Sequence, residues 1–175
     1  LGLIEDRKQV IQQGEDNFQQ DFSGDLEAVF INFNAGSITL QSGTALQVEG
    51  TDIPTGLSAS LDNGQLVIED RESSNFLPNL IGKENLPNLI VTIPRDTQLK
   101  KLELEIGAGN GKLSQIITDE LTIKQGAGEI IADQLQANSG KLNGGAGAVH
   151  FTAVQLNDFE IKGGVGVINI QGIVT

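Results

Sequence analysis

The sequence predicts an all-β protein: a single-stranded β-solenoid-like fold with 19-residue rungs in the C-terminal half and a more irregular β region in the N-terminal half. Three observations predict it. A small-residue triplet recurs every 19 residues, apolar residues recur in the same register, and polar residues alternate with them. The triplets are Gly107-Ala108-Gly109, Gly126-Ala127-Gly128, Gly145-Ala146-Gly147 and Gly164-Val165-Gly166. A fixed period is typical of repeat proteins, in which each unit buries its apolar face only against its neighbours.

Five apolar columns accompany the triplets in each 19-residue unit. They are Leu102, Leu121, Gly140 and Phe159; Leu104, Ile123, Leu142 and Ile161; Gly111, Ile130, Val149 and Ile168; Leu113, Ala132, Phe151 and Ile170; and Ile116, Leu135, Val154 and Ile173. The positions between them are mostly polar, and this period of two indicates strands with one buried face. We therefore expect strand, tight bend, strand and corner in each unit, with units stacked about 4.8 Å apart in parallel.

The glycine triplets are interpreted as sharp corners of the backbone. Glycine-rich loops can also bind phosphate, but that use needs a following helix N-terminus and usually a lysine. A strand pattern follows each triplet here. Glycine tolerates the backbone angles of a sharp corner, and we expect the small central residue to point inward.

A polar column, Asp119, Asn138 and Asn157, also recurs at 19 residues. Such a column at a corner is typical of a structural ladder, in which side chains bond local backbone and the next rung. A row of calcium sites is the alternative, and it would need several converging oxygen ligands for each ion. The structural ladder is the favoured interpretation.

The N-terminal half divides into an entry segment and irregular strands. Residues 1–25 are rich in Gln and charge and are expected to be a linker or entry segment, with Phe18 and Phe22 as anchors. Residues 26–175 are expected to form a single domain. Residues 29–40 repeat the strand–bend–strand pattern in degenerate form, with Asn34-Ala35-Gly36 at the bend.

Shorter patterns complete the N-terminal half. Leu46 and Val48 suggest a strand, and residues 57–68 predict a hairpin whose turn is Asn63-Gly64. Residues 71–88 are expected to be a long loop, and residues 89–93 a strand that Pro94 ends. No long helical period is present.

Composition excludes several classes of function. The 175 residues match one ordinary domain. The absence of Cys excludes disulfides, thiolate metal sites and a Cys nucleophile. A net charge of −12 with no Tyr or Trp argues against nucleic acid as a partner. No run of 18 apolar residues exists. Because the chain opens with Leu1, we expect a fragment whose missing N-terminal region carried a leader, an anchor or another domain.

No catalytic, cofactor-binding or metal-binding residue is predicted. Asp119, Glu120, Asp133 and Asp158 are carboxylates of the repeat region, but Asp133 shares its column with Ser, Thr and Gln, so no acid–base cluster forms there. Val149 and Ile168 occupy the positions where calcium-binding nonapeptide repeats carry Asp. His150 lies in an outward column and is interpreted as a surface residue.

Several segments resemble one bacterial family. They are Leu89-Ile90-Val91-Thr92-Ile93-Pro94, residues 99–109, residues 123–130 and residues 159–166. About residues 26–175 resemble the adhesin-like family whose β-strand repeats form the toastrack domain. The resemblance implies a right-handed, solenoid-like β fold on the outer side of a bacterial membrane, often after a transmembrane segment. It supplies no catalytic motif, and some relatives accompany envelope-stress systems.

We therefore expect a non-enzymatic, extracytoplasmic interaction or adhesion module of a bacterial cell surface, membrane-anchored in the full-length protein. Its partner would be a protein or a cell-envelope component. An envelope-stress accessory domain that binds a membrane protein or a cell-wall ligand is the alternative, and a polysaccharide-cleaving β-helix enzyme is less favoured. The last rung ends at Ile173-Val174-Thr175 without a charged or Pro-containing cap. Open edges invite strand addition, so we expect self-association or partner docking there.

Overall fold

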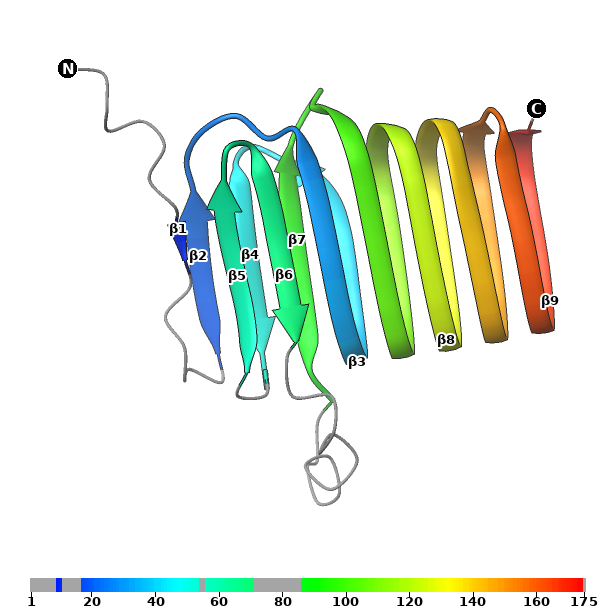
Figure 1. Ribbon diagram of the computed structural model, residues 1–175, viewed down its shortest axis with the longest axis horizontal. Coiled ribbons are helices and arrows are strands. Elements are labelled where there is room, and N and C mark those ends of the chain that lie inside the picture. The colour runs from blue at the N-terminus through cyan, green and yellow to red at the C-terminus, as the bar shows by residue number, and fades with distance from the viewer. Residues whose placement is uncertain (1–8, 11–16, 54–55, 71–85, 175) are drawn as a thin grey trace.

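A computed structural model describes residues 9–10, 17–53, 56–70 and 86–174. Every regular element among these residues is a strand (Figure 1). The strands are β1 (Gln9–Val10), β2 (Phe18–Phe22), β3 (Ala28–Gly43), β4 (Leu46–Thr51), β5 (Leu57–Asp62), β6 (Gln65–Asp70), β7 (Asn88–Pro94), β8 (Gln98–Leu156) and β9 (Phe159–Val174). The predicted all-β class is confirmed.

The C-terminal half is a coil of stacked rungs, in which β8 winds continuously and β9 forms the last rung (Figure 1). β9 pairs with β8 in parallel, and partners such as Leu142 and Ile161 are 19 residues apart. The predicted rung length is therefore confirmed. The strand does not break at the glycine bends, because bend residues also pair with their equivalents, as Ala146 does with Val165.

β3 is the first rung of the coil, as the degenerate pattern of residues 29–40 predicts. It pairs in parallel with the start of β8, from Ala28 opposite Lys101 to Leu40 opposite Leu113. Its other edge is shared between two strands, since residues 28–32 pair with β6 and residues 37–43 pair with β7. One bent strand thereby joins the coil to two separate runs of N-terminal strands, β6-β5-β1 and β7-β4-β2.

Within each N-terminal run neighbouring strands are antiparallel, whereas β6 and β7 join β3 in parallel. β5 and β6 form the predicted hairpin, and its turn residues Asn63 and Gly64 have φ of 50° and 77°, the left-handed angles that a two-residue turn requires. β4 and β7 confirm the strands predicted at residues 46–48 and 89–93. Of the predicted loop, residues 71–85 lie outside the described residues, and Asn88 already belongs to β7.

Part of the predicted entry segment is a strand of the sheet. β2 pairs antiparallel with β4, with Phe18 opposite Gly50. Phe22 is buried and Phe18 packs against the core, so both act as the expected anchors. Strand pairing therefore begins before residue 26, and the division between an entry segment and a single domain at that residue stays a prediction.

The core follows the predicted apolar columns. Leu102, Leu104, Ile123, Leu142 and Phe151 are at most 1% exposed. Where the column holds glycine the next rung fills the gap: a Cβ on Gly140 would lie 2.6 Å from the Phe159 ring. Burial of each large apolar side chain contributes about 1.5–3 kcal/mol, so this stack dominates the stability of the coil.

The prediction that the central residue of each triplet points inward is wrong for the repeat region. Ala108, Ala127 and Ala146 are exposed. The inward position is the residue immediately before the triplet, and Ile106 and Gln125 there are buried. The alternation of the incoming strand continues up to the bend, so Ile106 follows Leu104 into the core, and the central residue then lies on the outside of the corner. Among the bends whose central side chain the structure describes, the earlier bend in β3 alone matches the expectation, because Ala35 is 4% exposed.

The last apolar column is also wrong in the final rung. Val154 pairs with Gly172, and Ile173 pairs with Gln155, because the register shifts by one residue between Thr152 and Val154. Such a bulge places one extra residue in one strand and changes which side chains face each other. The 19-residue column thus ends at Val154.

Candidate binding surfaces

Each full rung of β8 has two corners, as the expected order of strand, bend, strand and corner predicts. Gly109, Gly128 and Gly147 have φ between 122° and 155°. A Cβ on Gly128 would lie 1.8 Å from the carbonyl oxygen of Gly109 in the rung before, so a side chain there would push the rungs apart. The glycines therefore serve close stacking, as the structural interpretation of the triplets predicts.

The second corner is made by residues that are not glycine. Gln115, Gln134 and Ala153 recur at 19 residues and have φ of 58°, 55° and 55°. Left-handed backbone costs an L-residue roughly 1–2 kcal/mol. Gln and Ala are not typical of such positions, so composition provides no signal for this corner; only its spacing from the glycine triplets does.

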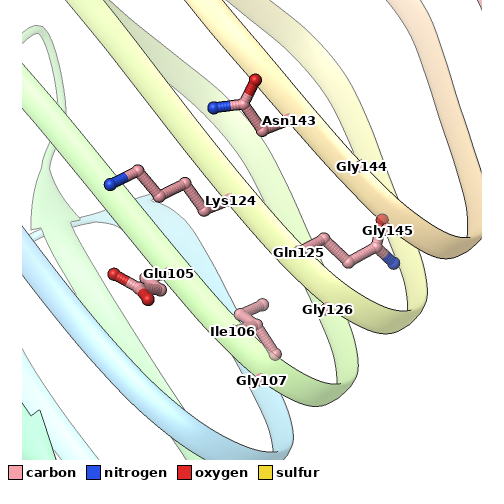
Figure 2. Close-up of a pocket in the computed structure, with 9 residues that line it drawn as sticks. All are labelled: Glu105, Ile106, Gly107, Lys124, Gln125, Gly126, Asn143, Gly144 and Gly145. Carbon is pink, nitrogen blue, oxygen red and sulfur yellow. The ribbon is translucent and has the colours of Figure 1, made fainter. Parts of the chain in front are cut away.

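A shallow groove of about 410 Å³ runs along the glycine bends of three rungs (Figure 2). Glu105, Lys124 and Asn143 occupy equivalent positions on these rungs and line it together with the bends at Gly107, Gly126 and Gly145. The groove therefore offers side chains of both charges beside bare backbone. Such an open surface can form hydrogen bonds with a partner but encloses no reacting group.

The polar column forms part of the predicted ladder. Asn138 Nδ2 donates a hydrogen bond of 2.8 Å to Oδ1 of Asp119, one rung earlier. In the third rung the backbone N–H of Asn157 donates to the carbonyl oxygen of Ala137 at 3.0 Å. Among the described residues, no group of three or more His, Cys, Asp or Glu side chains could hold a metal ion. These contacts favour the structural interpretation over the calcium row.

The other residues considered for chemistry lie apart. His150 is half-exposed, with Nε2 3.8 Å from Oε2 of Glu129 on the neighbouring rung. Asp133 is partly exposed on a different column, and Glu120 and Asp158 are exposed. Within the described ranges, no helix is long and apolar enough to cross a membrane.

The two ends of the sheet differ in how they present their edges. At the N-terminal end the outermost described strands are β1, of two residues, and β2, of five. At the other end β9 has 16 residues and pairs only with β8 among the described strands. Val167 and Ile168 of β9 are 60% and 42% exposed. Short edge strands limit unwanted pairing, so β9 is the edge best able to accept another strand.

The coil of 19-residue rungs, its two packed N-terminal runs of strands and its open last rung define a β-solenoid-like protein. Residues 25–175 match the family model described as Toastrack DUF4097, and the chain belongs to this family, as the sequence resemblance predicts. A comparison with curated proteins found no match.

Two solved structures are similar to this chain to different degrees. The "putative cell adhesion protein" from Clostridium sporogenes ATCC 15579 is 12% identical, with a TM-score of 0.62, and the match covers 95% of this chain and 99% of that one. The "putative adhesin" from Bacteroides fragilis NCTC 9343 is also 12% identical, covering 91% and 100%, but its TM-score of 0.37 is too low to support an argument. At this identity the first likeness shows the fold alone.

Proposed function

We propose that this chain is a non-catalytic interaction module of adhesin type on the extracytoplasmic side of a bacterial cell, and that it binds by strand addition at the free edge of β9. The family and the name of the similar C. sporogenes protein support the adhesin class. The observation that carries the mode of binding is the 16-residue β9, which pairs on one side only among the described strands.

The chemistry of this edge suits a strand partner. A free edge presents a row of backbone N–H and C=O groups, and an added strand satisfies them in the way that sheet ladders do. Residues 163–175 contain no charged residue, although the whole chain carries a net charge of −12. The part of the edge beyond Lys162 therefore adds no charge that would repel another negatively charged chain.

A second copy of the chain is the partner that we infer first. Two β9 edges can pair antiparallel about a two-fold axis, which uses the same surface on both copies. Antiparallel pairing also requires no crossover connection, which parallel strands within one chain need. Exposed Val167 would then be flanked by side chains of the added strand.

Sedimentation velocity over a range of protein concentrations tests this proposal. The unmodified chain is expected to form dimers, and Val167→Lys is expected to weaken them by about tenfold or more, equivalent to about 1.4 kcal/mol, because a lysine on an edge strand opposes pairing. Ala148→Lys is the matched control, since residue 148 pairs with residue 167 one rung away from the edge. A chain that stays monomeric at high concentration, or equal effects of both variants, would refute the proposed edge pairing.

A further inference from the structure

The apolar core of the coil is open at its C-terminal end. In the next-to-last rung the inward residues Leu142, Val149 and Phe151 are at most 2% exposed. Their partners in the last rung are Ile161, Ile168 and Ile170. Ile168 is 42% exposed, and the other two isoleucines are only partly buried. The end face of the coil is therefore an exposed apolar core as well as a free strand edge.

β9 is folded into two arms, one on each side of this core (Figure 1). It bends at Gly166, whose φ is 154°, so the arms are residues 159–163 and 167–172. One arm is roughly 20 Å long and its layer about 10 Å thick, so pairing one arm alone would cover on the order of 200 Å² per copy. Specific protein–protein interfaces need roughly 1,000 Å² in total. The whole end face, roughly 30 Å by 20 Å, would bury about that area from two copies together.

The first arm carries a charge pattern that is complementary to itself. Glu160 and Lys162 lie on its outward face, on either side of inward Ile161, and Nζ of Lys162 is 3.2 Å from Oε1 of Glu160. If two such arms pair antiparallel with Ile161 opposite Ile161, each Glu160 lies opposite Lys162 of the second copy. Registers centred on Glu160 or on Lys162 would instead place like charges directly opposite each other, which destabilises strand pairing.

We propose that two copies of the chain meet end to end, with Ile161 opposite Ile161 and both arms of β9 paired antiparallel, so that their two cores become one. This arrangement rests on the edge pairing proposed above and adds its register and its apolar contact. Exposed ion pairs contribute little affinity. The charges of Glu160 and Lys162 therefore select the register, and burial of the isoleucines supplies the affinity.

The second arm agrees with the same two-fold axis. Ile161 and Asn169 lie four residues before and four after residue 165, the centre of the bend, so they sit across the coil from each other. An axis that passes through Ile161 of one arm therefore brings Asn169 opposite Asn169 in the other. Ile168 then faces Ile170 of the second copy, and inward isoleucines meet inward isoleucines in both arms.

Charge reversal in the first arm tests the register by sedimentation velocity. Glu160→Lys or Lys162→Glu alone would place like charges opposite each other and should raise the dimer dissociation constant about tenfold. The double variant exchanges the two charges at constant net charge and should restore the original dissociation constant. Lys124→Glu is the matched control, because it makes the same change of charge in the same column two rungs from the edge.

A cysteine in the open core tests whether the two cores meet. The chain contains no Cys, so Ile161→Cys should give a disulfide-linked dimer on mild oxidation. Directly opposite side chains have Cβ atoms about 4.5–5.5 Å apart, and a small shift lets them join. Ala127→Cys places a thiol on an exposed bend away from the end face and should stay mostly monomeric.

The outcomes separate the end-to-end arrangement from the edge pairing on which it rests. A chain that never dimerises would refute both. Dimers that Val167→Lys weakens, but that the single charge reversals leave unchanged or the double variant fails to restore, would refute the register and retain the edge pairing. An Ile161→Cys variant that cross-links no faster than Ala127→Cys would refute the merged core.

Discussion

Asn138 Nδ2 lies 2.8 Å from Oδ1 of Asp119, the residue 19 positions earlier. The two side chains are exposed and belong to successive rungs, so this hydrogen bond repeats on the surface the register that the apolar columns set in the core. A ladder of this kind links neighbouring coils without help from burial.

We expect Asn138→Ala to lower the free energy of unfolding by about 0.5–1.5 kcal/mol, the usual net value of one hydrogen bond. Urea denaturation of the single variants and of Asp119→Ala combined with Asn138→Ala would measure the coupling between the two side chains. Strictly additive effects would mean that the contact contributes nothing to stability.

Calcium is expected to leave the thermal stability unchanged. The oxygen Oδ1 of Asp119 already accepts a hydrogen bond, and the described residues hold no group of three acidic or imidazole side chains. A ligand that binds only the folded state stabilises it by RT ln(1 + [L]/Kd) and therefore raises Tm. Melting curves with calcium or with a chelator should therefore coincide. A clear increase in Tm with calcium would support a row of calcium sites instead.

Gly128→Ala should lower the free energy of unfolding by about 3 kcal/mol or prevent folding. The new Cβ would overlap the carbonyl oxygen of Gly109, and residue 128 has a positive φ that alanine tolerates poorly. Its neighbour supplies the control: Ala127→Ser should stay within about 0.5 kcal/mol, because residue 127 is exposed. Chemical denaturation measures both. Similar losses of unfolding free energy in the two variants would contradict the assignment of residue 127 to the outside of the bend and residue 128 to the contact between rungs.

The second corner makes the opposite prediction for glycine. Gln134 is exposed and has φ of 55°, so Gln134→Gly should leave stability unchanged or raise it by up to about 1 kcal/mol, since relief of strain offsets the entropy of glycine. Gln134→Val should lower it by about 1–2 kcal/mol, because β-branched residues tolerate this conformation poorly. Denaturation midpoints that rank valine above glycine would show that the corner is not left-handed.

Salt should strengthen the self-association proposed for β9. Each copy carries a net charge of −12, and added salt screens repulsion between copies. The uncharged edge of residues 163–175 loses little attraction in return. Sedimentation at about 50 and 500 mM salt should show a smaller dimer dissociation constant at the higher salt concentration. A larger dissociation constant at 500 mM would instead indicate dimers held by ion pairs.

Several parts of the fold could be predicted from sequence because they depend on period and local conformation. The 19-residue spacing predicted which residues stack, alternation predicted that Leu104 and Ile123 are buried, and Asn63-Gly64 predicted the hairpin turn. These features depend on residues that are close in the chain or related by a constant interval.

The remaining features were decided by tertiary structure. The exposed Ala127, the left-handed Gln134 and the bulge after Thr152 all depend on how one rung sits on the next. A repeat determines by itself which residues correspond between rungs. Packing of the rungs at one strand spacing determines the rest. It sets the direction in which a bend points its side chain, and the space that remains where a neighbouring rung has glycine.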